Sequence, residues 1–233
     1  GSYWLAHTNF QYQQSGHPGG IKRLLDDAHL DFIAAPNSMY DRGIGGVTYS
    51  HGMLDSFTKH GKLAIAEEDI RTPQTRNKVQ TLMEDVNDWD GVIDAMTRNA
   101  LYSFVKGHGY WWLDLGGDGQ YVHKALIERA SLLRNLMNDN NAGYSARSVS
   151  EIALVVDPEA AYYLRSESPL QRCIELFQMS EICRIGAPYD YFHIADLENG
   201  LDRDYKLYIF LGSFRITDNV RAYIESQIKK RGA

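Results

Sequence analysis

Three consecutive acids, Glu67, Glu68 and Asp69, are the residues of this chain best suited to chemistry. They follow a short apolar run, Leu63 to Ala66, that lies between a glycine and a proline. Such a run is typical of a buried strand in a parallel sheet or barrel. In α/β enzymes, the loops that leave the C-terminal ends of these strands carry the catalytic groups. The stretch is therefore predicted to be an active-site strand. The alternative is a solvated acidic turn after an edge strand.

The elements that must position these acids alternate between strand and helix. The predicted strands are Tyr3–Phe10, Asp31–Ala35, the run from Leu63, and Tyr110–Leu115. Amphipathic helices are predicted from Ile21, from His51, over Trp89–Val105 and over Tyr121–Met137. Strand and helix in this repeated order require right-handed parallel crossovers, and so an α/β sheet or barrel. Four such units amount to half of an eight-stranded barrel.

A run of turn-forming residues, Asn138–Gly143, predicts a domain boundary. Beyond it, strands are predicted at Ile152–Val156, Tyr189–Ile194 and Leu207–Leu211, with a last helix reaching Lys230. Three strands with crossovers indicate a doubly wound, flavodoxin-like domain. We expect domains over residues 1–140 and 148–233. Because the last helix ought to feed another strand, the chain is expected to be cut at both ends.

Composition narrows the function classes. The chain has 233 residues, 44% of them hydrophobic, and a net charge of −6. Its length allows one large domain or two ordinary ones. A mildly acidic chain without a basic run argues against nucleic acid or an anionic membrane as the main partner, and no apolar segment approaches the length of a membrane span. Cys173 and Cys183 are ten positions apart in one predicted helix, too far along its axis for a disulfide, and are expected to be small core residues.

Several stretches together resemble glycoside hydrolase family 42, the β-galactosidase-like enzymes. They are HGKLAIAEEDIRT, GHGYWWLDLGG, SEIALVVDPEAAYYL, RIGAPYDYFHIADL and DYKLYIFLGSF. The resemblance covers nearly the whole chain. It implies the C-terminal half of a (β/α)8 barrel, about strands five to eight, followed by an amidotransferase-like, flavodoxin-type domain that helps to build trimers.

The resemblance also implies a chemistry. Retaining glycosidases need two carboxyl groups about 5 to 5.5 Å apart, an ionised nucleophile and a protonated acid. The family's nucleophile is a Glu at the end of the seventh strand, and Glu67 occupies the matching place. Glu68 is the competing candidate. Side chains alternate along a strand, so the two cannot both serve. The family's acid/base Glu lies on the fourth strand, which this sequence does not contain. An inactive fragment that binds sugar or promotes assembly is therefore the alternative function.

Five further residues are candidates for substrate binding. Trp112 and Asp114 share a strand face with Tyr110, and a Trp at a barrel mouth can stack on a sugar ring. Tyr40 and Arg42 lie in the loop after the sixth strand, where Tyr40 could donate a hydrogen bond to the nucleophile. Arg71 is expected to pair with Glu68 or Asp69. Core packing for Trp112 and loop packing for Tyr40 and Arg42 are the simpler alternatives.

No cofactor or metal is expected. His108 and His123 could join Asp114 and Asp118 as ligands, but their spacing matches no zinc or calcium pattern. A metal-dependent hydrolase using Glu67, Asp69 and His108 is a third possible function. No Cys stands at a strand-to-helix turn of the second domain, so amidotransferase chemistry is not expected there. The expected partners are a carbohydrate substrate and further copies of the chain, such as in a trimer.

Overall fold

The computed structural model describes residues 2–3, 20–38, 40–75, 86, 88–114, 116–140, 147–165 and 168–232. The protein is of the α/β class. One sheet has the strand order β1-β2-β3-β4 and the other has the order β6-β5-β7. The chain divides into two compact units, each described below by itself. The first unit comprises Gly1–Ala35, His51–Ala64 and Ser148–Ala233, and the second comprises Pro36–Ser50 and Ile65–Arg147.

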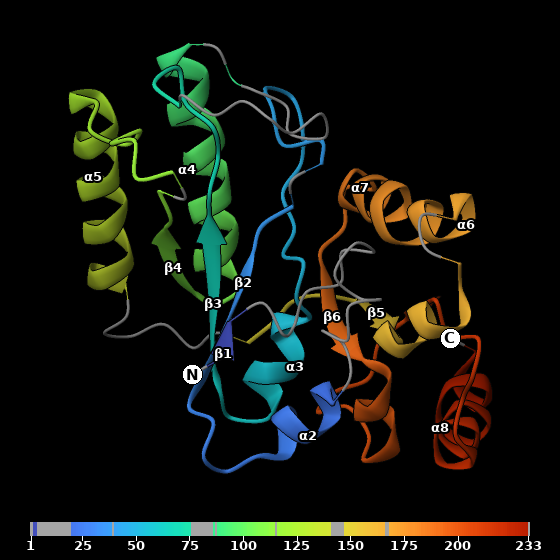
Figure 1. Ribbon diagram of the computed structural model, residues 1–233. Coiled ribbons are helices and arrows are strands. Elements are labelled where there is room, and N and C mark those ends of the chain that lie inside the picture. The colour runs from blue at the N-terminus through green and yellow to red at the C-terminus, as the bar shows by residue number, and fades with distance from the viewer. Residues whose placement is uncertain are drawn as a thin grey trace. The chain divides into compact units, whose positions relative to one another are not determined.

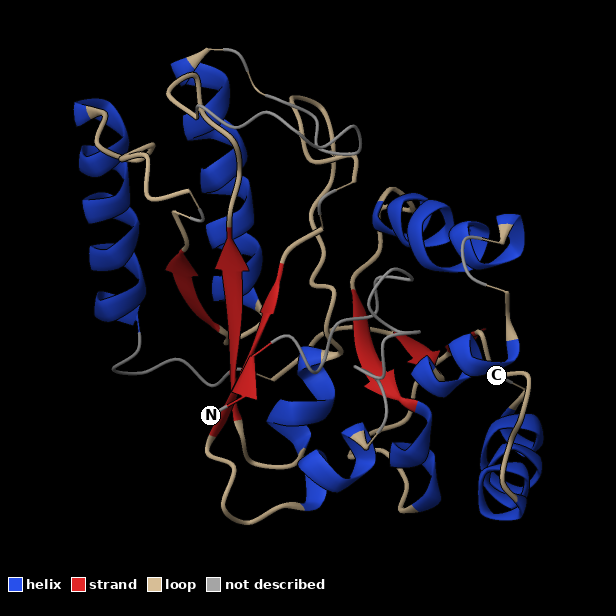
Figure 2. Cartoon of the chain, in the orientation of Figure 1, coloured by secondary structure: helices blue, strands red, loops and turns tan. Residues whose placement is uncertain are grey.

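The second unit holds the C-terminal part of β3 (Leu63–Glu68), together with β4 (Gly109–Trp112), α4 (Trp89–Val105) and α5 (Lys124–Asn140). The strands β3 and β4 are parallel, as their arrows in Figure 2 show, and Glu67 is in register with Trp111. Helix α4 packs against both β4 and α5 (Figure 1). This strand–helix–strand–helix order agrees with the order predicted from the sequence.

Helix α4 has clear local causes. Asp88 caps its N-terminus, and its side chain accepts a hydrogen bond from the Gly91 N–H at 2.7 Å. At Gly91, a Cβ atom would lie 2.6 Å from the side chains of both Ile44 and Val86, so only glycine allows this close packing. The helix buries an apolar stripe in a core cluster of the second unit. That cluster is Ile70, Val86, Val92, Ile93, Ala95, Met96 and Leu126.

Helix α5 begins and ends three residues later than predicted. The Asp114 carboxylate accepts backbone N–H bonds from Asp118, Gly119 and Gln120, which hold this segment in a loop. The helix then continues through Asn140, so the first residues of the predicted boundary are helical. The rest of that boundary, 141–146, lies outside the described residues, as do Trp4–Phe10 and 76–85.

The first unit contains two sets of parallel strands. Strand β1 (Ser2–Tyr3) pairs with β2 (Phe32–Pro36), and α2 (Ile21–Asp26) and α3 (Leu54–Lys59) belong to the same unit. The other set is β5 (Ile152–Val156), β6 (Tyr189–His193) and β7 (Leu207–Leu211). β5 lies between β6 and β7, parallel to both. The predicted bounds of β5 and β7 are confirmed, and β6 is one residue shorter than predicted.

Helical segments connect these strands. After β5 come η1 (Pro158–Tyr163), α6 (Pro169–Arg172), η2 (Cys173–Phe177) and α7 (Gln178–Cys183). After β6 comes η3 (Ile194–Glu198). After β7 come α8 (Asp218–Tyr223), η4 (Ile224–Ile228) and η5 (Lys229–Arg231). Within η2, Cys173 is exposed, so its predicted place in the core is wrong. The Thr217 side chain caps α8 by accepting from the Val220 N–H.

Contacts inside the first unit join α3 to β6 and to the loop after η3. Asp55 accepts the Tyr191 N–H at 2.8 Å, and Ser56 accepts the His193 N–H at 2.6 Å. Lys59 and Asp202 form an ion pair at 2.7 Å.

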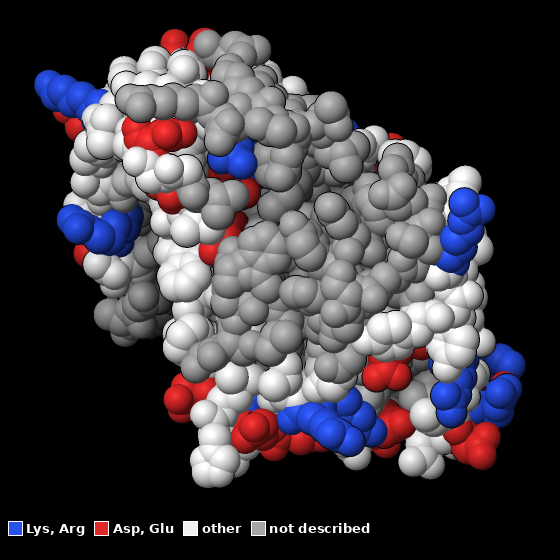
Figure 3. All heavy atoms as spheres, viewed as in Figure 1, with Lys and Arg blue, Asp and Glu red and all other residues white. Residues whose placement is uncertain are grey.

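Among the described residues that Figure 3 shows, charges of both signs are interspersed rather than segregated by sign.

Candidate functional site

The three acids that follow the apolar run of β3 are all buried, with 0 to 2% of each residue exposed. The alternative of a solvated acidic turn is therefore wrong. Burying a carboxylate is costly unless hydrogen bonds or opposite charges compensate it. The partners of each acid consequently indicate what that acid can do.

Glu68 lies on the sheet face that α4 covers. Its carboxylate accepts hydrogen bonds from the Ile70 N–H at 2.9 Å, from the Tyr110 hydroxyl at 3.0 Å and from the Asn99 amide. Burial raises the pKa of Glu68, and the nearby Arg42 and these donors only partly oppose it. Glu68 is thus fixed inside the layer between sheet and helix, where a substrate has no access.

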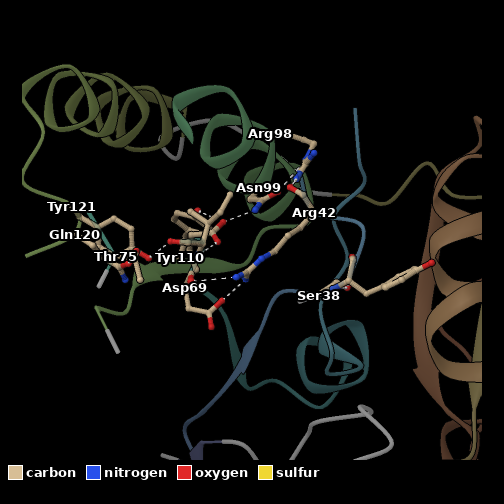
Figure 4. A network of polar contacts seen from close by, with 12 residues as sticks. Ser38, Arg42, Asp69, Thr75, Arg98, Asn99, Tyr110, Gln120 and Tyr121 are labelled. Carbon is tan, nitrogen blue, oxygen red and sulfur yellow. Dashed lines mark hydrogen bonds and ion pairs between the residues drawn. The ribbon is translucent and has the colours of Figure 1, made fainter. Parts of the chain in front are cut away.

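Asp69 is paired with Arg42. One guanidinium nitrogen lies 2.6 Å from the carboxylate, and both side chains are buried (Figure 4). Burial lowers the pKa of Arg42, but the carboxylates of Asp69 and Glu68 raise it, and the net shift is upward. Arg98 donates to the Arg42 and Gly43 carbonyls at 2.8 and 3.0 Å, which fixes the loop that carries Arg42.

Glu67 occupies the opposite face of β3. Its carboxylate accepts a hydrogen bond from the Trp111 indole N–H at 3.0 Å. The register pairs Glu67 with Trp111 and Glu68 with Trp112, and residues in register in a parallel sheet point to the same face. Trp111 is 42% exposed although Glu67 itself is buried. Glu67 is therefore the acid of the three that lies beside a partly exposed aromatic ring.

This register separates Trp112 from Glu67. Trp112 packs against the core cluster of α4, with its ring 5.6 Å from that of Tyr121. Trp112 is therefore a core residue, as the alternative to a sugar-binding role predicted. Trp111, which the sequence analysis did not select, is the aromatic neighbour of Glu67. The sequence predicts that Trp111 and Trp112 point to opposite faces of the strand. It does not predict the register that pairs Trp111 with Glu67.

The other candidates shape loops. The Asp114 carboxylate accepts hydrogen bonds from three backbone N–H groups of its own loop. The backbone N–H of Tyr40 donates to the Ser38 hydroxyl, which in turn donates to the Tyr40 carbonyl. Arg71 is buried, but the cation that pairs with Asp69 is Arg42 and not Arg71. The expected pairing is corrected because the long loop after β2 folds back and brings its arginine to the end of β3.

A neighbouring network ties the loop after β3 to the loop after β4. The Thr72 hydroxyl donates to the Gln120 carbonyl at 2.9 Å, and Thr75 bonds the Gln120 side chain (Figure 4). The Tyr121 hydroxyl donates to the Ile70 carbonyl at 3.0 Å. These bonds connect the loops at the C-terminal ends of both strands, and so hold the backbone around the three acids.

A pocket of about 340 Å³ lies between β4, α4 and α5. Its lining includes Tyr110, Trp111, Trp112, Leu133 and Arg134. None of the three acids lines it. This pocket is therefore not a sugar-binding hollow lined by Glu67.

Metal binding finds little support among the side chains that the structure describes. No group of three or more His, Cys, Asp or Glu residues in those parts could hold a metal ion. The ring of His123 stacks on that of Trp89, with centroids 4.1 Å apart. The structure thus does not bring His108 and His123 together with Asp114 and Asp118 as ligands.

The chain matches no protein-family model, no curated protein and no solved structure. Its function must therefore be argued from the site itself. Across the described residues, no helix has both the length and the apolar composition needed to cross a bilayer.

Proposed function

We propose that this chain is part of a retaining glycoside hydrolase that cleaves β-galactosides or related glycosides, with Glu67 as the nucleophile. In this proposal, residues 1–140 are the second half of a (β/α)8 barrel and residues 148–233 are a flavodoxin-like domain. The resemblance to glycoside hydrolase family 42 supplies the substrate class and the expected homo-oligomer.

The observation that carries the proposal is the difference among the three acids. Glu68 is enclosed on the α4 face, and Asp69 is neutralised by Arg42. Glu67 lies on the opposite face and accepts a hydrogen bond from the indole N–H of the partly exposed Trp111. A nucleophilic carboxylate needs to be ionised, oriented and next to a surface that can receive a sugar. Of the three, Glu67 is the acid that is oriented by a donor on the open face and lies beside a partly exposed aromatic ring.

The mechanism follows double displacement. A Glu67 oxygen attacks the anomeric carbon as the bond to the leaving oxygen breaks, giving a covalent glycosyl ester. Water then attacks the same carbon, releases the Glu67 carboxylate and gives a sugar with retained configuration. Protonation of the leaving oxygen, and later deprotonation of the water, fall to an acid/base Glu on a strand upstream of Tyr3. Trp111 holds the nucleophile through its indole N–H and offers a flat apolar ring beside it.

Covalent trapping tests the assignment in the full-length protein. A 2-deoxy-2-fluorogalactoside with a dinitrophenolate leaving group needs no protonation at departure, so the test reports on the nucleophile rather than on the acid. Mass spectrometry should find the fluorosugar on the peptide that contains Glu67, and Glu67→Gln should abolish both trapping and turnover.

Glu68→Gln is the matched control, because it makes the same carboxylate-to-amide change in the adjacent acid on the opposite face. Since the new amide N–H group faces the donors of Ile70, Asn99 and Tyr110, the fold of this variant is verified by circular dichroism. Its trapping should remain close to that of the unaltered protein. A label on Glu68, or on any other residue, would remove Glu67 from the role. Hydrolysis of a chromogenic galactoside by the 233-residue chain alone would refute the inactive-fragment alternative.

A further inference from the structure

The sheet of β5, β6 and β7 contains a point where the strand order reverses. The chain leaves the central strand β5 for β6 on one side, and then passes to β7 on the other side. The segments after β5 and β7 therefore start side by side at the C-terminal ends of these two strands. In open parallel sheets, ligands bind beyond the C-terminal ends of the strands at this switch point.

The two segments meet closely there. Asp157 directly follows β5, and its N–H donates to the Leu211 carbonyl at the end of β7 at 3.2 Å. Gly212 comes next after β7 with a φ of +64°. A Cβ atom at Gly212 would lie 3.3 Å from the Ala160 Cβ and 3.5 Å from the Asp157 carbonyl oxygen. Glycine is therefore suited both to the backbone conformation and to the close approach.

Polar groups of both segments gather around this point. The Asp157 carboxyl accepts the Glu159 N–H at 3.0 Å, and burial raises the pKa of this carboxyl to about 6. Arg215 lies within electrostatic reach of Asp157 and donates to the Tyr163 hydroxyl at 3.2 Å. A carboxyl and a guanidinium group thus come from the two different strand ends.

Aromatic side chains accompany these polar groups. Tyr163 is 61% exposed and Phe214 is 52% exposed. Large apolar side chains exposed beside convergent polar groups are a usual composition of sites for small molecules. The acids Asp157 and Glu159 disfavour a phosphate, and no glycine-rich phosphate loop follows β5.

We propose that the switch point between β5 and β7 binds a small, uncharged, hydroxyl-rich ring of the monosaccharide class. Asp157 accepts hydrogen bonds from its hydroxyls and Arg215 donates to them, while Phe214 or Tyr163 packs against the C–H face of the ring. This site does not depend on Glu67, so it stands or falls separately from the proposed hydrolase function.

The test places fluorine on the proposed site. The full chain is labelled with 4-fluorophenylalanine, and the ¹⁹F resonance of Phe214 is assigned by its loss in Phe214→Leu. Titration with methyl β-galactoside, methyl β-glucoside and methyl β-xyloside should shift the Phe214 resonance saturably for at least one of them. Arg215→Ala and Asp157→Asn should each weaken that binding at least fivefold, with folding verified by circular dichroism.

Two control variants separate the alternatives. Lys206→Ala removes an exposed charge at the opposite end of β7 and should leave the binding unchanged. Glu67→Gln should also leave the Phe214 shift unchanged, even where it abolishes covalent trapping. The proposal is overturned if no monosaccharide shifts the resonance saturably or if the Arg215 and Asp157 variants bind as well as the unaltered chain. A preference for adenosine monophosphate, or a Phe214 shift that follows protein concentration instead of sugar, would also overturn it.

Discussion

The ends of β3 and β5 place acids in similar positions but stabilise them differently. At β3, Glu67, Glu68 and Asp69 each have a side-chain partner, and Asp69 has a buried cation. At β5, Asp157 is held by backbone N–H groups, and the cation that acts on it, Arg215, is exposed. Both strands are buried at their C-terminal ends and parallel to their neighbours, so the strands themselves do not cause the difference.

The comparison shows how the surroundings of a carboxyl group set its use. Asp69 forms a buried ion pair with Arg42, and the pair compensates the loss of hydration of both groups. Burial raises the pKa of Asp157 to about 6, and it also raises the pKa of Glu68, although the nearby Arg42 partly opposes that shift. Glu67 differs from all of these, because its described donor, Trp111, is itself partly exposed.

The largest expected effect comes from breaking the buried pair. Arg42→Ala leaves the Asp69 carboxylate buried without its cation, which should lower the free energy of unfolding by about 3–5 kcal/mol. Urea unfolding measures the loss. Arg42→Lys keeps the charge but not the planar fork, and should lose less. A loss below about 1 kcal/mol for Arg42→Ala would show that Asp69 does not need this cation.

The next effect concerns the nucleophile. Trp111→Phe keeps an aromatic ring but removes the N–H bond to Glu67, and a hydrogen bond to a charged group contributes about 1.5–3 kcal/mol. The rate of trapping by the fluorosugar should therefore fall about tenfold or more. Trp112→Phe, on the opposite face, should change that rate by less than about threefold. An equal loss in both variants would show that the rate of trapping does not depend on which face of β4 the tryptophan occupies.

Asp157 should give a smaller, pH-dependent effect. Its pKa is about 6 in the folded protein against an ordinary 3.8, so the folded state holds this proton more tightly than the unfolded state. Its contribution to stability is full below pH 3.8 and is lost as the pH rises to about 6. Because the group is partly hydrated, we expect a difference of about 1 kcal/mol.

Asp157→Asn keeps the acceptor for the Glu159 N–H but removes the titration. Relative to the unaltered chain, this variant should gain about 1 kcal/mol between pH 4 and 7, as measured by urea unfolding at several pH values. Subtraction cancels the other carboxyl groups, which both proteins share. Parallel pH curves for the two proteins would rule out the raised pKa.

The smallest effect should come from a surface pair. Lys22→Ala removes the partner of Glu198, and with Lys22 about half exposed the loss should be about 0.5 kcal/mol or less. The hydrogen bond from Lys22 lowers the pKa of Glu198, so its contribution is present above the ordinary carboxyl pKa and disappears as the pH falls through the lowered value. Thermal unfolding at neutral and acidic pH checks both points. A loss comparable to that of Arg42→Ala would mean that burial does not control the strength of these pairs.

Much of the secondary structure could be predicted because local patterns dominate it. The uninterrupted apolar runs predicted β5 and β7, and the helical spacing of apolar residues predicted α4. Helix α5 was misplaced by three residues because Asp114 holds the following loop through backbone hydrogen bonds. A pattern of apolar residues does not record such a bond.

The candidate site was only partly predictable for a similar reason. The position of the acids at a strand end was readable from the apolar run before them. Their partners come from positions up to 44 residues away in the sequence, as with Trp111 and Glu67. A shift of the β4 register by one residue would bring the other tryptophan to the face of Glu67.

The sequence by itself determined that acids follow a buried strand and that Glu67 and Glu68 point to opposite faces, because side chains alternate along any strand. Only the tertiary structure decided which face α4 covers, and hence which acid is enclosed. It also decided that Arg42 meets Asp69 and that Trp111 meets Glu67. Those meetings depend on strand register and on the path of a long loop, and both are set by the packing of residues distant in the chain.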